Sequence, residues 1–153
     1  MLTMICLLSC NTKTEESNKT ESHDAHAMKS GSMDDRTKEL MAIHDSLMLS
    51  MDELMNLRKQ MTVEIKKTDS LITLKPSASL TDRKENALQI KTQLEKADEE
   101  MMNWMHQYKA DSLDKLSKER ANDYVADQKQ QIISVKNLMQ KSISDAQLFI
   151  QNK

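Results

Sequence analysis

A regular spacing of core-type residues dominates the middle of this chain. From Leu40 to Ile72, the positions that would face a neighbouring helix follow one another at alternating intervals of four and three residues. Such intervals form the seam of a coiled coil, in which one stripe of each helix packs against its partners. A chain with this pattern folds into long helices that must bury one side. The seam consists of Leu40, His44, Leu47, Met51, Leu54, Arg58, Met61, Ile65, Thr68 and Ile72.

The composition favours helices throughout. The sequence contains one Gly, one Pro and 3% aromatic residues. Residues that form turns are therefore scarce, while Leu, Met, Lys, Glu and Gln, which favour helices, are abundant. The net charge is −2 with both signs interspersed. This distribution provides no basic stripe, so we expect no nucleic-acid partner.

Three helices are predicted, over residues 33–74, 79–109 and 113–151. Short links between successive helices make them antiparallel neighbours. We therefore predict an all-α fold, an elongated antiparallel three-helix coiled-coil bundle over residues 33–153.

The ends of these helices follow from local residues. Pro76 cannot continue the first helix, and Ser79 is the expected N-cap of the second. The third helix is expected to start between Leu113 and Lys118, after a polar link. The second seam comprises Leu80, Arg83, Ala87, Ile90, Leu94, Ala97, Met101, Trp104 and Tyr108, and the third comprises Ala121, Val125, Gln128, Ile132, Val135, Leu138 or Met139, Ile143, Ala146 and Ile150.

The N-terminus resembles the end of a bacterial lipoprotein signal peptide. Leu7-Leu8-Ser9-Cys10 is an apolar run closed by a small residue and a cysteine. We predict that residues 1–9 are a signal peptide and that Cys10 is the lipid attachment site, which gives the protein a membrane anchor. Residues 10–32 then hold the lipidated cysteine and a polar, disordered tether.

Two details of this N-terminus shape the interpretation. No Lys or Arg precedes Lys13, although a signal peptide normally begins with a basic segment. A truncated signal, with Met1 or Met4 as an internal start, would account for this, and the alternative is the apolar N-terminus of a soluble protein. Asn11 is not the Asp that favours inner-membrane retention, so we expect an outer-membrane lipoprotein of the cell envelope that faces the periplasm.

Enzymatic activity is not expected. A phosphate-binding loop, a dinucleotide-binding turn and a nucleophile elbow each need several glycines, and the sequence has only Gly31. The sequence contains no HExxH or CxxC motif, and Asn103 stands where a Glu-x-x-His pair with His106 would need its Glu. We therefore predict no catalytic residues and no cofactor.

A hairpin turning at Pro76 would place residues 44–51 beside residues 101–108, and both segments are rich in Met. Met packs flexibly around aromatic side chains, so this region is first of all a candidate core. Thioether and imidazole groups also suit Cu(I) or Ag(I), which makes a soft-metal site the alternative. The candidate ligands are Met41, His44, Met48, Met51, Met101, Met105 and His106.

Two further candidates remain open. A Met-rich surface can also form an adaptable groove for a partner protein, with Trp104 as the candidate contact residue. In the tether, His23, His26 and Met28 lie within six residues and form a second potential metal-binding stretch.

The segments His44-Asp45-x-x-Met48-x-x-Met51-x-x-Leu54-Met55-x-Leu57 and Met101-Met102-x-Trp104-Met105-His106-Gln107-Tyr108 resemble a family of small Bacteroidota lipoproteins. These proteins often carry the label viral A-type inclusion protein. The resemblance covers most of residues 33–150 and implies a lipidated cysteine, a polar tether and a coiled-coil body, but no particular activity. We therefore expect a non-enzymatic envelope protein with a structural or protein-interaction role, whose partner is another envelope protein or a second copy of the chain. A periplasmic soft-metal binding protein is the alternative.

Overall fold

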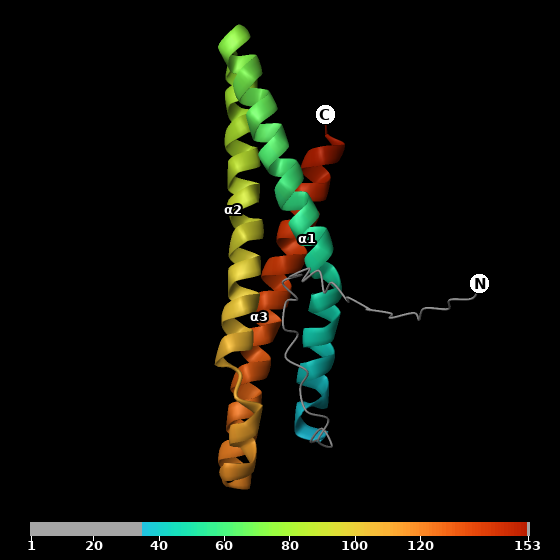
Figure 1. Ribbon diagram of the computed structural model, residues 1–153, viewed down its shortest axis with the longest axis vertical. Coiled ribbons are helices and arrows are strands. Elements are labelled where there is room, and N and C mark those ends of the chain that lie inside the picture. Colours follow the sequence, from blue (N-terminus) through green and yellow to red (C-terminus); the bar gives the residue numbers. More distant parts are fainter. Residues whose placement is uncertain (1–34, 153) are drawn as a thin grey trace, which may run out of the picture. The chain divides into compact units, whose positions relative to one another are not determined.

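Three long helices pack against one another in pairs (Figure 1). The computed structural model describes residues 35–152, which belong to one compact unit, Ser32–Lys153. The helices are α1 (Asp35–Leu74), α2 (Ala78–Gln107) and α3 (Lys118–Gln151), and a 3-10 helix, η1 (Ala110–Lys115), links the last two. The predicted all-α three-helix bundle is confirmed. The predicted signal peptide, Cys10 and the tether lie outside the described residues.

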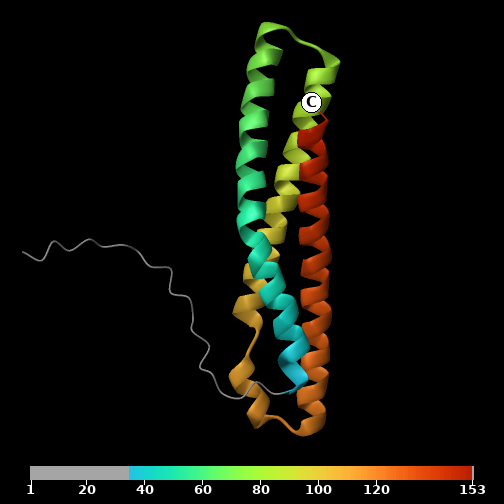
Figure 2. The same ribbon diagram turned by 90° about the vertical axis from the view of Figure 1, so that its right-hand side faces the viewer.

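The helices form two successive hairpins. α1 and α2 run antiparallel on either side of the link at Pro76, and α3 returns alongside both. Figure 2 shows that the α1–α2 hairpin continues past the end of α3, while η1 lies at the opposite end of the bundle. The three predicted seams therefore pack together along most of the length of α1. Beyond the end of α3, only α1 and α2 face each other.

The α1–α2 link is set by one proline and one serine. α1 ends at Leu74, before Pro76, and Ser77 adopts an extended conformation as the N-cap of α2. The Ser77 hydroxyl accepts a hydrogen bond of 3.2 Å from the backbone N–H of Leu80, which satisfies one of the unpaired donors of the first turn. The prediction that Ser79 is the N-cap is wrong, because its backbone is already helical.

The link between α2 and α3 differs from the prediction at its start. The second helix ends at Gln107 rather than at residue 109, and the third begins at Lys118, the last position of the range predicted for its start. The backbone N–H of Lys109 donates instead to the hydroxyl of Tyr124 on α3, over 2.7 Å. This bond comes from a distant part of the chain, so a local pattern does not reveal it. None of the described residues has a positive φ angle, and the helices end without a glycine cap.

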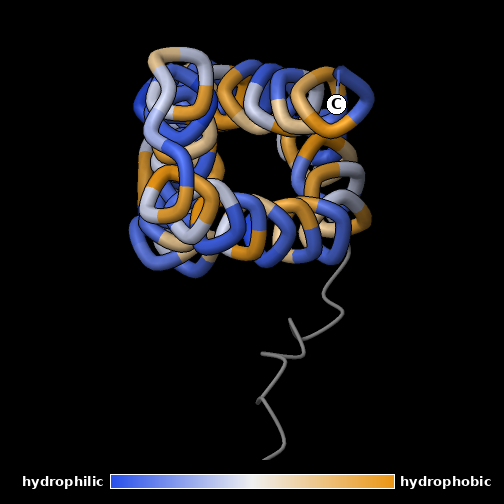
Figure 3. Tube along the Cα trace, turned by 90° about the horizontal axis from the view of Figure 1, so that it is seen from above, coloured by the Kyte–Doolittle hydropathy of each residue, from blue (hydrophilic) through white to orange (hydrophobic). Residues whose placement is uncertain are grey.

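Most of the core is one stripe of side chains from all three helices. Seen along the bundle, each helix alternates hydrophobic and hydrophilic residues (Figure 3), as expected when only one side is buried. None of the helices in residues 35–152 carries an apolar stretch long enough to cross a bilayer. The fully buried large side chains include Leu40, Leu54, Met61, Leu94, Met101, Ile132 and Met139.

Ion pairs at the flanks of this stripe fix the helices in register. Arg58 Nη1 on α1 lies 3.0 Å from Asp98 Oδ2 on α2. On the other side of α1, Lys129 Nζ of α3 lies 2.7 Å from Glu39 Oε2. Each such pair contributes little free energy at the surface, but the pairs identify which flank of α1 faces which neighbour.

Arg83 holds all three helices together near the end of α3. Its Nε donates to Glu64 Oε1 of α1 over 2.8 Å, and its Nη1 donates to the backbone oxygen of Asn152 over 2.9 Å. The guanidinium also lies 4.3 Å from the centre of the Phe149 ring. The last turn of α3 has no basic residue of its own, so Arg83 supplies the positive charge that a helix C-terminus favours.

We predict that Arg83→Ala lowers the free energy of unfolding by about 2 kcal/mol, because a charged hydrogen-bond donor and a cation–π contact are lost together. Urea unfolding followed by circular dichroism measures the change. Lys91→Ala is the control, since Lys91 pairs only with Glu95 one turn away on the same helix and its loss should cost less than about 0.5 kcal/mol. Equal losses for the two variants would contradict a special role for Arg83.

Candidate functional site

The predicted meeting of the two Met-rich segments is confirmed by an aromatic contact. The ring of His44 on α1 lies 5.7 Å, centre to centre, from the ring of Trp104 on α2, at an angle of 38°. The hairpin at Pro76 therefore brings together residues that lie far apart in the sequence. This contact fixes the level at which the two segments face each other.

The His44–Trp104 contact is the first step of a longer row of rings. Trp104 stacks on Tyr108 at 5.2 Å, and Tyr108 lies 6.3 Å from Tyr124 of α3. Three of the four aromatic side chains in the sequence thus gather at this end. Sequence reasoning missed Tyr124, although its position next to the seam residue Val125 at the start of α3 could have suggested it.

Trp104 is a core residue. It is 4% exposed, and its indole Nε1 donates to the backbone oxygen of Gln128 on α3 over 3.3 Å. The expectation that Trp104 is the contact for a partner is therefore corrected, because the folded bundle covers its ring. Its large apolar surface is used to join α1, α2 and α3.

Gln128 is a buried polar residue of this region whose side-chain oxygen lacks a hydrogen bond. It lies in the third seam, as predicted, and is 5% exposed. Among the residues that the structure describes, its Oε1 is the one buried side-chain oxygen or nitrogen without a hydrogen-bond partner. A buried acceptor without a donor destabilises the fold by the cost of removing it from water.

The predicted soft-metal ligands separate into buried and accessible groups. Met41 and Met101 belong to the core, and Met101 is 0% exposed. Met51 and Met105 pack partly buried against that core. Met48, which the sequence predicts to face the second helix, is 42% exposed. It lies one position beside the seam residue Leu47, at the edge of the stripe.

The two histidines of the prediction also differ in their surroundings. His106 is exposed near the end of α2. His44 is largely covered, with 16% of its side chain exposed, and its Nδ1 lies 2.9 Å from Oδ1 of Asp45. An ionised carboxylate only accepts hydrogen bonds, so Nδ1 is the donor in this pair, and in the neutral ring Nε2 then carries the free electron pair.

Oxygen, imidazole and thiol ligands do not by themselves form a metal site here. Within residues 35–152, no three His, Cys, Asp or Glu side chains come close enough together to hold a metal ion. A set of three or more ligands that includes His44 would therefore need thioethers. Met102, which the sequence-based ligand set omits, is 42% exposed on α2.

Two open grooves lie at the other end of the bundle, around Arg83. One of about 260 Å³ is lined by residues of α1 and α3, among them Val63 and Ile150. The other, of about 430 Å³, runs between α2 and α3 and is mainly polar, with Asn86 and Gln93 among its residues. The residues that line the two grooves include no His.

Comparison of the chain with protein-family models, curated proteins and solved structures gives no match. Its function must therefore be inferred from the residues themselves.

We predict that Gln128→Met raises the free energy of unfolding by about 1 kcal/mol, because it replaces an unpaired buried oxygen by an apolar group of similar size. Thermal and urea unfolding measure the change. Gln130→Met, on the exposed side of α3, is the matched control and should stay within about 0.5 kcal/mol of the parent. Destabilisation by Gln128→Met would show that Oε1 has a partner in solution.

Proposed function

We propose that this chain is a non-enzymatic, lipid-anchored protein of the cell envelope with a structural or protein-interaction role. The observation that carries the proposal is the filled interior of the bundle. The seam residues of α1, α2 and α3 pack into one core over most of its length. The surface is thus the part of the bundle that is available for function.

The anchor is supported by the sequence of the N-terminus. Leu7-Leu8-Ser9-Cys10 has the order of residues that lipoprotein processing requires, and a polar segment follows it. The mature chain would then contain no thiol, because Cys6 lies in the signal peptide and Cys10 carries lipid. With Asn11 after the cysteine, we place the protein at the periplasmic face of the outer membrane.

Exposed apolar side chains on α1 support the interaction role. Leu49, Val63 and Leu74 are 86%, 65% and 83% exposed. Their spacings of 14 and 11 residues correspond to nearly whole numbers of helical turns. They therefore follow the outer side of α1, and they replace Trp104 as the candidate contacts for an envelope protein or a second copy of this chain.

We predict that Cys10→Ser releases the protein from the membrane fraction of a Gram-negative host. A cysteine with two or three acyl chains anchors stably, whereas the free polypeptide has no comparable hydrocarbon. Both forms should carry two lysines inserted after Met1, so that the signal peptide has its basic segment. Mass spectrometry of the intact protein then tests for acyl chains on Cys10. An unmodified Cys10, or equal membrane retention of both forms, would refute the anchor.

We predict that a photo-crosslinking amino acid at Leu49 or Val63 gives one discrete adduct in intact cells. Glu99, on the exposed side of α2, is the control position and should give none. The adduct should disappear when Cys10→Ser removes the chain from the membrane, and its mass distinguishes a second copy from another envelope protein. Absence of adducts at both α1 positions, or the same pattern at Glu99, would argue against an interaction through this side of α1.

A further inference from the structure

We propose that His44 and Met48 of α1, together with Met102 and Met105 of α2, bind one soft monovalent cation, Cu(I) or Ag(I). The site lies on the outer side of the α1–α2 interface. It differs from the ligand set predicted by sequence, because it omits Met41, Met51, Met101 and His106 and includes Met102. It does not depend on the lipid anchor or on a protein partner.

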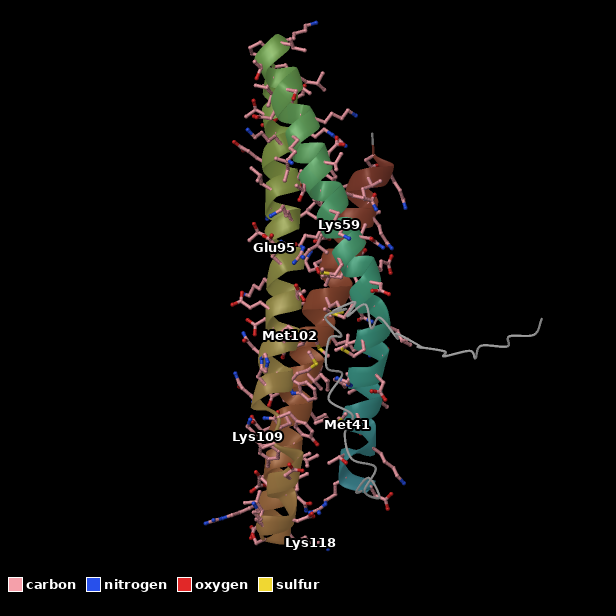
Figure 4. All side chains as sticks on the ribbon, viewed as in Figure 1. Met41, Lys59, Glu95, Met102, Lys109 and Lys118 are labelled. Atoms are coloured by element: carbon pink, nitrogen blue, oxygen red, sulfur yellow. The ribbon has the colours of Figure 1, made fainter. Side chains whose placement is uncertain are left out.

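The register of the two helices brings these four residues within about one helical turn of one another. His44 meets Trp104, and Met105 is the next residue of α2. Because the helices are antiparallel, Met48, one turn further along α1, lies level with the turn before Trp104, which contains Met102. In Figure 4, Met102 lies between the levels of Met41 and Lys59 of α1, as this register requires.

The ion pair between Arg58 and Asp98 shows that these residues are also on the facing flanks. Asp98 bonds to α1, and Met102 and Met105 follow it by four and seven residues, so they lie on the same side of α2. On α1, His44 precedes Arg58 by fourteen residues, which is close to four whole turns. Met48 follows His44 by one turn and shares this flank.

The exposure of the sulfur-bearing side chains separates binding positions from packing positions. Met48 and Met102 are each 42% exposed, whereas Met101, beside Met102, is 0% exposed. A cation can reach the first two without any opening of the helices. Met105 is partly buried beside them, so the four groups extend from the surface to the edge of the core.

The hydrogen bond of His44 prepares its ring for a cation. Nδ1 donates to Asp45 over 2.9 Å, which leaves the lone pair on Nε2. Ligating histidines in metal sites commonly donate their other ring nitrogen to a carboxylate in this way, which orients the ring and raises its basicity.

The chemistry of these ligands selects the ion. Three uncharged thioethers and one imidazole are soft donors that favour Cu(I) and Ag(I), while Mg²⁺ and Ca²⁺ prefer oxygen ligands. Two ligands at positions i and i+4 on one helix can hold the same ion. The pair His44 and Met48 has this spacing, and α2 completes the set from the other side.

The test is a titration with Ag(I) of the full chain carrying Cys6→Ser and Cys10→Ser, so that no thiolate competes for the ion. Binding is followed by the fluorescence of Trp104, which is the only tryptophan. We expect one equivalent to bind and to quench this fluorescence, because Trp104 contacts the His44 ring. With methionine methyl groups labelled for nuclear magnetic resonance, the signals of Met48, Met102 and Met105 should shift. Those of Met61 and Met139, in the core, should not.

Two triple variants separate binding from packing. Met48→Leu, Met102→Leu and Met105→Leu together should weaken Ag(I) binding at least about a hundredfold, while Leu preserves the volume of each side chain. Met41→Leu, Met101→Leu and Met61→Leu together change the same number of thioethers in the core and should leave the affinity unchanged. Asp45→Asn should weaken binding about tenfold through the orientation of His44.

Three results would overturn the proposal. The first is equal weakening by the two triple variants, and the second is no binding by the parent chain. The third is binding that persists in the first variant and is lost when His23, His26 and Met28 are replaced by Ala, which would locate the ion in the N-terminal segment. Circular dichroism of each variant confirms that the helices are retained.

Discussion

Each helix of this bundle has only one stripe of apolar residues, and the rest of the structure depends on covering that stripe. A single hairpin would leave part of both stripes in water, since two helices cover each other along one line only. α3 closes the third side, and Ile132 and Met139 meet Leu54 and Leu94 in one core. Helix packing of this kind contributes most of the free energy that holds amphipathic helices folded.

Polar contacts then select one register among the many that such uniform stripes allow. Arg58 with Asp98 and Arg83 with Glu64 join α1 to α2, and Lys129 with Glu39 joins α3 to α1. A shift of either helix by one turn would separate these partners while keeping apolar residues in contact. The indole of Trp104, with its single donor directed at the backbone of α3, adds a constraint that an aliphatic residue could not supply.

The helices, the hairpin at Pro76 and the contact between His44 and the Trp104 segment could be predicted from sequence, because an unbroken spacing of four and three defines both the helix and its buried side. The spacing does not define how wide the buried stripe is. Met48 and Met101 illustrate this. Met48 lies beside a seam position and is 42% exposed, whereas Met101 lies in a seam position and is 0% exposed. That difference depends on where the third helix lies.

At two helix ends, the local sequence did not predict where the helix begins or ends. Ser77 and Ser79 are equally good capping residues, and only the extended conformation after Pro76 selects Ser77. The end of α2 depends on the hydroxyl of Tyr124, fifteen residues away from Lys109. The candidate site shows the same limit, because Met102 and Met105 become neighbours of Met48 only through the antiparallel register.

The α1–α2 hairpin that extends past Asn152 has a consequence for how the protein opens. Beyond the end of α3, two helices pack alone, and near the tip Leu71 is 41% and Leu74 is 83% exposed. Local opening is least costly where few apolar contacts must be broken. Amide hydrogens should therefore exchange first near Pro76 and last in the middle of the core, so that the bundle frays from the tip while the end containing Trp104 stays closed.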